Sequence, residues 1–476
     1  MSELPQGWVL VPLGTLIELN PKTIAVEDCT EVGFVPMALL GKRWFDVPGF
    51  ELRQWASVKK GYTHFQNGDV LLAKITPCFE NGKAGLIRGL PNGIGSGSTE
   101  YFVCRTNAGT LDSRYLLAYL KTDDFVHTGA MSMTGSVGHK RVPKEYLLGR
   151  EIPLAPQREQ TRIANQLDTL LTRVQACNDR FAAIPALLKR FRNSVLAAAV
   201  SGRLTGDLRS NDLITSNTTT TALWRIPASW TWVRADEVTG FITKGTTPSK
   251  EKMTSGSGEI PYIKVYNLGF DGRLDFNIDP TFVDSTTHSV DLKRSITLPG
   301  DVLMNIVGPP LGKVAIVPDS HQEWNINQAI ARFRPVRGLR SQYLAHCLMS
   351  TELISHAVSQ AKATVGQLNL TLEICRALPI PMPPEKEQTE IVRRVEALFA
   401  LADRIEARCA AARAQAQRLS PLVLAKAFRG ELVPQDPNDE PASALLARIG
   451  LAKAAAAKPE KKTPIARKQA ARKTVI

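Results

Sequence analysis

The residues best suited to chemistry are basic, amide, hydroxyl and aromatic side chains that recur in polar segments of both halves of the sequence. Lys and Arg neutralise phosphates, and Asn, Gln and Arg form paired hydrogen bonds with base edges in the major groove. Each side chain alone is more typical of a solvated surface, but the two sets together favour binding to DNA. The sets are Lys42, Arg43, Lys59, Lys60, Tyr62, Lys74, Ser136, His139, Lys140 and Arg141, then Lys244, Thr246, Thr247, Lys250, Lys264, Tyr266, Asn267, Asn327, Gln328, Gln367 and Asn369.

The common motifs of catalysis are missing from the sequence. The run from Gly308 to Val314 is one residue too short for a phosphate-binding loop and lacks its hydroxyl. No metal-spaced His/Cys cluster, Gly-x-Ser-x-Gly or Asn/Asp-Pro-Pro-aromatic loop occurs. Asp69 and Asp301, each in Gly-Asp-Val-Leu, are interpreted as turn acids before a strand. We therefore expect no catalytic residue and no metal site.

Charge and composition restrict the class of protein. The 476 residues carry a formal charge of +14, but the last 26 residues hold eight Lys or Arg and one Glu. That Ala/Lys-rich tail has too little apolar surface to fold, so basicity alone does not indicate nucleic-acid binding. The seven cysteines are scattered, which favours reduced thiols, and no apolar stretch is long enough to cross a membrane. We expect a cytoplasmic protein without membrane contact.

An internal repeat organises the chain. Residues 152–163 recur as residues 380–391, with seven of twelve positions identical at an offset of 228 residues. The same offset relates Gly202 to Gly430, whereas matches farther upstream drift to other offsets. Constant spacing in one part of each unit and drifting spacing in the other predict a rigid element joined to a variable one.

The rigid element is predicted to be a long helix. Apolar residues recur at alternating spacings of four and three from Ile163 to Val195, and again from Ile391 to Val423. This is a heptad seam, and two equal seams in one chain are best buried against each other in an antiparallel pair. Gly202 and Gly430 suit the helix ends, and Pro185 and Pro421 predict a kink in each helix.

The variable elements read as mixed helix and strand. Short apolar runs predict strands at residues 70–73, 84–87, 101–104, 260–265, 302–306 and 314–317, and helices are expected at 113–120 and 341–348. The predicted fold class is α+β: two mixed α/β domains separated by two long antiparallel coiled-coil helices, with a pseudo-two-fold internal repeat.

Several motifs together resemble a known family. The chain opens with Leu-Pro-x-Gly-Trp-x-x-x-Pro-Leu-Gly, and an Ile-Pro run ending in Glu-Gln precedes the heptad helix in both halves. The second half has Gly-Thr-Thr-Pro at 245–248 and Ala-Phe-Arg-Gly-Glu-Leu at 427–432, where the first half departs with Ala-Val-Ser-Gly at 199–202. Over residues 1–450 the sequence resembles the specificity (S) subunits of type I DNA restriction–modification enzymes.

The resemblance implies a domain plan and a role. It implies target-recognition domains at 1–150 and 223–378, conserved helical regions at 151–205 and 379–435, a linker at 206–222 and a C-terminal segment with a basic, disordered tail at 436–476. Such a subunit is not an enzyme. It reads a bipartite, asymmetric sequence in double-stranded DNA with a fixed spacer and docks two methyltransferase subunits, joined by motor–nuclease subunits for restriction.

The resemblance also places the cofactors and a docking site. S-adenosylmethionine, and ATP and Mg2+ for restriction, are expected on the partner subunits. By position, Glu159, Gln160, Glu387 and Gln388 are expected either to dock partners or to cap the helices. Two alternatives stay open: a self-contained methyltransferase or nuclease with unrecognised motifs, and a coiled-coil adaptor that binds protein.

Overall fold

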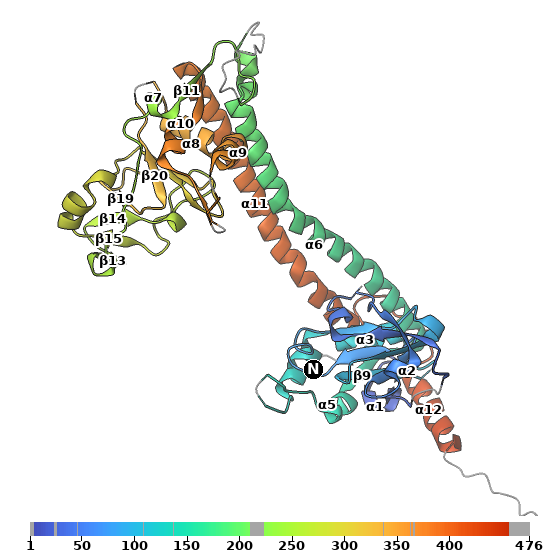
Figure 1. Ribbon diagram of the computed structural model, residues 1–476. Coiled ribbons are helices and arrows are strands. Elements are labelled where there is room, and N and C mark those ends of the chain that lie inside the picture. The colour runs from blue at the N-terminus through green and yellow to red at the C-terminus, as the bar shows by residue number, and fades with distance from the viewer. Residues whose placement is uncertain are drawn as a thin grey trace, which may run out of the picture. The chain divides into compact units, whose positions relative to one another are not determined.

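The computed structural model describes residues 4–22, 26–44, 46–107, 109–136, 138–209, 223–336, 338–361, 363–364 and 367–456. The chain divides into two compact units (Figure 1). Unit 1 comprises Met1–Phe181 and Ala411–Ile476, and unit 2 comprises Ala182–Ala410. Each unit therefore combines one globular part with a portion of both long helices.

Unit 1 contains two four-stranded sheets and a two-stranded pair. The pair joins β1 (Val9–Pro12) to β10 (Glu151–Leu154). One sheet has the order β2 (Ile17–Leu19), β9 (Tyr101–Thr106), β6 (Val70–Ala73), β7 (Ala84–Leu86), and the other β4 (Glu51–Gln54), β3 (Glu31–Val35), β8 (Ile94–Gly97), β5 (Thr63–Gln66). Its short helices are α1 (Leu13–Leu16), α2 (Trp55–Val58), α3 (Ser113–Leu120), α4 (Asp123–Met131) and α5 (Lys144–Gly149), with the 3-10 turn η1 (Met37–Leu39).

Unit 2 repeats this plan. Its pair is β11 (Thr231–Arg234) with β23 (Pro379–Met382), and its sheets are β12 (Thr243–Lys244), β20 (Ile330–Phe333), β16 (Val302–Asn305), β18 (Val314–Ile316), and β13 (Met253–Ser255), β15 (Thr281–Val283), β14 (Ile260–Ile263), β19 (Asn325–Ile326). A third sheet orders β17 (Val307–Gly308), β22 (Gln367–Asn369) and β21 (Ala363–Thr364). The remaining elements are α7 (Ala235–Val238), α8 (Ser341–Met349), α9 (Thr351–Gln360), α10 (Leu372–Ala377), the 3-10 turns η3 (Arg203–Leu208), η4 (Lys250–Lys252), η5 (Val265–Asn267) and η7 (Lys293–Ser295), and the π-helical turn η6 (Thr287–Asp291).

The sheets confirm the repeat and the mixed α and β class. A strand lies in each of the six apolar runs expected to form one, and α3 and α8 occupy the two expected helices. Each unit has one parallel strand pair, β3–β8 or β14–β19, and the other strand pairs among the described residues are antiparallel. Asp69 and Asp301 are turn acids as expected, and each is buried against an arginine, Arg105 or Arg334. The duplication therefore extends from sheet order to individual ion pairs.

The two long helices are α6 (Gln157–Val200) and α11 (Glu385–Phe428), each of 44 residues. Both continue through their internal proline. In unit 1, Leu171 near the start of α6 shares a core with Leu424 near the end of α11. In unit 2, Leu196 near the end of α6 shares a core with Phe399 of α11. The helices are therefore antiparallel within each unit, as predicted.

The strict heptad seam is wrong at two positions in each helix. Cys177 and Phe191 of α6 are exposed, and so are their repeat equivalents Ile405 and Leu419 of α11. A helix turns once per ~3.6 residues, so a pattern of period 3.5 moves off the buried face along its length. The shared position of the exposed residues shows that both helices drift alike.

Two parts of the predicted domain plan lie outside the described residues: residues 210–222 of the linker and residues 457–476 of the tail. The helix α12 (Ala442–Ala456) extends past residue 451, so the expectation that the tail has no folded structure from there is wrong for its first six residues. Alanine has the highest helix propensity of all residues, and the start of the tail is rich in alanine. Among the described residues, no helix is long and apolar enough to cross a bilayer.

The helix-terminating glycines generate a first prediction. Gly202 has φ +74°, and an added Cβ would lie 2.4 Å from Cγ of Pro227. We expect Gly202→Ala to lower the free energy of unfolding by about 1–3 kcal/mol, through left-handed strain and the clash. Gly206→Ala is the control, because nothing lies within 4 Å of its added Cβ. Urea unfolding of both variants measures the difference, and equal midpoints would contradict the prediction.

Candidate nucleic-acid interface

Three segments of unit 1 bring part of the predicted DNA-binding set together. They are the turn at 98–100 after β8, residues 74–76 after β6, and the loop at 134–141 after α4. The backbone N–H of Lys74 donates to the carbonyl of Glu100 at 3.0 Å, and an isolated antiparallel bridge joins the second segment to the third. The expected residues of these segments, Lys74, Ser136, His139, Lys140 and Arg141, therefore gather beyond the end of the parallel strand pair.

Unit 2 builds the same place from the equivalent segments. Residues 327–329 follow β19, β17 follows β16, and β21 and β22 form the hairpin. The N–H of Ile306 donates to the carbonyl of Ala329 at 2.9 Å, which repeats the backbone bond of unit 1. The structure thus brings together Asn327, Gln328 and Asn369 of the expected set, while the side chain of Gln367 lies outside the described residues. The two units therefore form equivalent candidate sites, which share a backbone arrangement but carry different side chains.

Arg141 is not a free cation in this site. Its Nε and Nη2 donate to the carboxylate of Glu100 at 2.9 and 2.7 Å, and its Nη1 to the carbonyl of His139 at 3.3 Å. The hydrogen bond from Arg141 lowers the pKa of Glu100, so this carboxylate stays charged. Arg141 therefore orders the loop, and Lys140 beside it is exposed. The sequence analysis missed Glu100, because no local pattern marks a pair 41 residues apart.

In unit 2 the expected Asn267 has a structural role. It is 1% exposed, accepts from the N–H of Lys264 at 2.9 Å, and donates to two backbone carbonyls. Because this amide is buried and its hydrogen bonds are made within the chain, it cannot reach a base edge. The prediction that Asn267 contacts DNA is therefore wrong. Tyr266 donates to Asp279 at 2.7 Å, and Lys264 lies 4.0 Å from the same carboxylate.

The loop of Lys244, Thr246 and Thr247 lies beside the end of the parallel pair. The hydroxyl of Tyr262 in β14 donates to the carbonyl of Thr246 at 2.8 Å and to the hydroxyl of Thr247 at 3.3 Å. Close packing on the backbone of residues 326 and 327 leaves no room for a side chain at Gly245. Lys244 is exposed here, and Lys250 is exposed in η4.

The remaining members of the first set occupy two other places. Tyr62 precedes β5, whose Thr63 pairs with Gly97 next to the turn at 98–100, and Lys60 is exposed just before it. Lys59 pairs instead with both oxygens of Asp28 at 2.7 and 2.8 Å.

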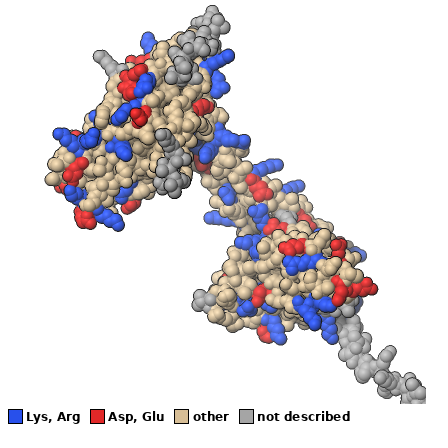
Figure 2. Space-filling model, in the orientation of Figure 1, with Lys and Arg blue, Asp and Glu red and all other residues tan. Residues whose placement is uncertain are grey.

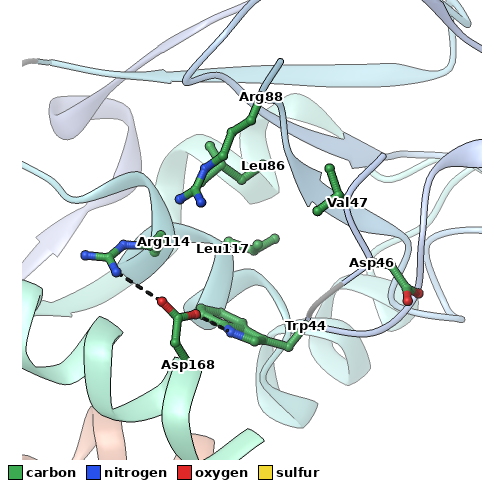
Figure 3. Close-up of a pocket in the computed structure, with 8 residues that line it drawn as sticks. All are labelled: Trp44, Asp46, Val47, Leu86, Arg88, Arg114, Leu117 and Asp168. Carbon is green, nitrogen blue, oxygen red and sulfur yellow. Dashed lines mark hydrogen bonds and ion pairs between the residues drawn. The ribbon is translucent and has the colours of Figure 1, made fainter. Parts of the chain in front are cut away.

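Lys42 and Arg43 are separate from the three segments. Their loop lies against α6, where the indole N–H of Trp44 donates to Asp168 at 2.8 Å and Arg114 donates to the same carboxylate at 3.1 Å (Figure 3). Arg43 itself faces Asp179 of the same helix at 3.7 Å. In the view of Figure 2, Lys and Arg are interspersed with Asp and Glu on both globular parts. Backbone geometry, more than net charge, therefore defines the candidate interface.

The four residues expected to dock partners or cap helices are buried where each long helix begins against its own globular part. We call each of these hydrogen-bonded clusters a lock; the locks consist of Trp8, Glu159 and Gln160 in unit 1, and of Trp230, Glu387 and Gln388 in unit 2. The amide of Gln160 accepts from the N–H of Asp112 at 2.9 Å and donates to the carbonyls of Thr110 and Ala155. Gln388 accepts from the N–H of Arg340 at 3.0 Å in the same way. Both glutamines are 0% exposed, so a direct role in partner docking is wrong for them.

The two glutamates complete the locks, with one difference between the units. Glu159 accepts from the indole N–H of Trp8 at 3.0 Å, and Glu387 from that of Trp230 at 2.9 Å. Both are buried, so they cannot dock a partner directly either. The second oxygen of Glu387 accepts from Thr205 at 2.7 Å and pairs with Arg209. The second oxygen of Glu159 has no hydrogen-bond partner among the described residues, and burial raises the pKa of this carboxyl.

This difference generates a second prediction. Glu387→Gln removes a buried charge that three donors share, and we expect it to destabilise unit 2 by about 2–4 kcal/mol. Glu159→Gln replaces an oxygen that already lacks a partner, so we expect a cost to unit 1 of about 1 kcal/mol or less. Amide hydrogen exchange in the strand pairs β11–β23 and β1–β10 measures the two effects separately. A larger effect at Glu159 would overturn this account of the locks.

Sequence comparisons place the chain among known proteins. Residues 227–411 match the family model described as type I restriction modification DNA specificity domain. The chain is 34% identical over 336 residues to the type I restriction enzyme EcoBI specificity subunit of Escherichia coli, covering 68% of each chain. It is 26% identical over 481 residues to the EcoEI specificity subunit of E. coli, covering 85% of this chain and 80% of that one.

Solved structures share the fold. A chain from a structure titled for complex assembly and conformational transition of the type I R-M system has a TM-score of 0.67 at 19% identity, covering 90% of this chain and 100% of that chain. The HsdS subunit from Thermoanaerobacter tengcongensis has a TM-score of 0.60 at 20% identity, covering 90% and 98%. These similarities confirm the predicted fold class. Together with the relatives in sequence, they show that this chain belongs to the family of type I restriction enzyme specificity subunits.

Proposed function

We propose that the two globular parts read the two different halves of a split, asymmetric sequence in double-stranded DNA. The observation that carries this proposal is one scaffold built twice with different side chains. In both units the same backbone hydrogen bonds hold three loop segments at the end of a parallel strand pair. The first set contains Lys74, His139 and Lys140. The second contains the exposed Gln328, Asn327, whose side-chain oxygen accepts from the N–H of Ala329, and Asn369, whose side-chain oxygen is buried without a hydrogen-bond partner among the described residues.

The chemistry of these side chains suggests a division of labour. Exposed lysines such as Lys60, Lys140 and Lys244 suit phosphate contacts, which position the protein without reading sequence. Amides such as Gln328 form paired hydrogen bonds with adenine and so suit base readout. Charge alone would bind any duplex, so the amide-rich loops carry the specificity in this proposal.

As a type I specificity subunit, the chain is the DNA-recognition component of a multisubunit restriction–modification enzyme and not its catalytic component. We propose that two methyltransferase subunits dock on it, and that motor–nuclease subunits join the complex for restriction. S-adenosylmethionine, and ATP and Mg2+ for restriction, would bind those subunits. The equal lengths of α6 and α11 support a further proposal, that the helices set the number of base pairs between the two half-targets.

A third prediction tests the division of labour. We expect Lys140→Ala to weaken binding to all duplexes alike and to reduce the slope of log affinity against log salt by about 1. We expect Gln328→Ala to relax base preference in one half of the target only, at a cost of about 1–3 kcal/mol for the preferred base. Fluorescence anisotropy at several salt concentrations and sequencing of methylated sites measure the two effects.

The third prediction has a matched control and a clear contrary outcome. Lys22→Ala changes another exposed lysine of unit 1, outside the three segments, and should leave both DNA affinity and the slope of log affinity against log salt unchanged. A change in both half-targets on Gln328→Ala would contradict independent reading by the two units.

A further inference from the structure

The strand that leads into the amide-rich loop of unit 2 lies at the edge of its sheet. In unit 1 the corresponding strand, β8, lies between β3 and β5, and four residues of β5 pair with it. In unit 2 the strand β19 pairs with β14 and ends the sheet (Figure 1). Beside it, the described residues supply one isolated bridge, between Thr297 and Trp324. Because β19 has only two residues, its main chain makes few bonds to hold it in place.

A buried cluster of polar side chains adds to the bonds of β19. It consists of Asn325 in β19, His288 in η6 and Ser295 in η7, which are 0%, 4% and 1% exposed. Nδ2 of Asn325 lies 3.0 Å from Nδ1 of His288, and the hydroxyl of Ser295 donates to Oδ1 of Asn325 at 2.7 Å. Nε2 of His288 lies 3.0 Å from a carboxylate oxygen of Glu323. Side chains thus tie β19 to the two turns that precede Thr297.

Backbone groups fix the orientation of the Asn325 amide. Its Oδ1 accepts from the N–H of Ile326 at 3.1 Å, and its Nδ2 donates to the carbonyl of Leu292 at 3.3 Å. A backbone N–H only donates and a carbonyl only accepts, so an amide turned the other way would face like groups on both sides. Nδ2 is therefore also the donor to His288, whose Nδ1 must be an unprotonated acceptor. The ring proton then lies on Nε2, which donates to Glu323.

A second proton on His288 is incompatible with this arrangement. A protonated Nδ1 directs an N–H at the N–H of Asn325, whereas the carboxylate of Glu323 favours the protonated ring. The other charged groups of the surrounding elements have their own partners or face solvent: Asp284 accepts from Thr287, Asp291 pairs with Lys252, Arg332 donates to the carbonyl of Ile296, and Lys293 and Arg294 are exposed. Acidification therefore acts on the bond between His288 and Asn325.

The cluster is adjacent to the amides of the candidate interface. One residue separates Asn325 from Asn327, and Gln328 follows directly. The N–H of Asn327 donates to the carbonyl of Ile263 in β14 at 3.1 Å. The connection at 327–329 between β19 and β20 thus begins where Asn325 holds the strand. A displacement of β19 reaches Gln328 because so short a connection cannot absorb it.

We propose that His288 and Asn325 are positioning residues for base reading by unit 2, and that this role requires the unprotonated Nδ1 of His288. The inference rests on the proposed function, because it takes the loop at 327–329 to contact bases. The cluster holds Gln328 in place when His288 carries one proton. The second proton breaks the bond to Asn325 and loosens β19, so discrimination between bases in one half-target falls as the pH falls. The half read by unit 1 does not depend on His288.

The test uses the full-length chain and duplexes that carry the target found by sequencing the sites methylated by the wild-type system. Single base pairs are changed in either half, and the half that responds to Gln328→Ala is assigned to unit 2. Fluorescence anisotropy at about pH 6 and about pH 8, on either side of the usual titration of histidine, gives the discrimination in each half. For the wild-type chain we expect discrimination in the unit 2 half to be about five-fold lower at the lower pH.

Two substitutions of His288 separate positioning from general stability. His288→Leu removes both ring nitrogens, and we expect discrimination in the unit 2 half to be about ten-fold lower at both pH values. His288→Asn keeps an acceptor near the position of Nδ1 that does not titrate, so we expect it to retain most of the discrimination and lose its pH dependence. His321→Gln is the matched control, because His321 is an exposed histidine of the same unit whose Nδ1 contacts Ser320. We expect it to behave as the wild type.

The outcomes distinguish this inference from the proposed function. Discrimination in the unit 2 half that does not change with pH in the wild type, or a pH dependence that persists in His288→Asn, would overturn the inference alone. Equal losses in both halves on His288→Leu would also overturn it, because they would show a general loss of structure. Absence of any effect of Gln328→Ala in either half would instead contradict base reading by this loop.

Discussion

The buried lock at the start of each long helix is the interaction on which the rest of each unit depends. A tryptophan indole, Trp8 or Trp230, donates to a buried glutamate, and the adjacent glutamine bonds to the backbone ahead of α3 or α8. Buried polar groups are costly unless they are paired, so these bonds tolerate little displacement. They hold the first turn of the helix against the strand pair and the globular part. The orientation of each recognition surface within its unit is therefore set where the helix begins.

The equivalent tyrosines extend this lock toward the strands. The hydroxyl of Tyr115 donates to the carbonyl of Pro153 at 2.6 Å, and that of Tyr343 donates to the carbonyl of Pro381 at 2.7 Å. Proline has no N–H to give to a neighbouring strand, but its carbonyl still accepts. These bonds tie the helix of the globular part to the strand that leads into the long helix. Because this frame is repeated in both units, the loops beyond the parallel strands can differ between the units without altering it.

Divergence has made the two copies different at places other than the recognition loops. Arg209 and Thr205 give Glu387 partners that Glu159 lacks, so the lock of unit 2 is better satisfied. Trp44 lines a groove of about 230 Å³ in unit 1, whereas the groove beside the long helices in unit 2 has a volume of about 610 Å³.

The sequence by itself determined the duplication, the class of fold and the long helices, because these depend on local pattern. Identical residues at one offset, short apolar runs between turn residues and apolar periodicity all persist without knowledge of distant contacts. The exposed Cys177 and Phe191 mark the limit of that reasoning, since an ideal heptad and a real helix differ in period. The amino-terminal motif and the Glu-Gln runs also sufficed for the family resemblance.

Only the tertiary structure decided what individual polar side chains do. Asn267 was expected to contact DNA, but its buried amide holds its own loop together. The two Glu-Gln pairs were expected either to dock partners or to cap the helices, and they are buried in hydrogen bonds to their own globular parts. Arg141 depends on Glu100, and Trp44 on Asp168, across separations that no local pattern records. The physical reason is that the same polar residue type can face solvent or a buried hydrogen-bond partner, and the sequence does not distinguish the two. Its role is set by burial and by the nearest donor or acceptor, which folding alone brings into place.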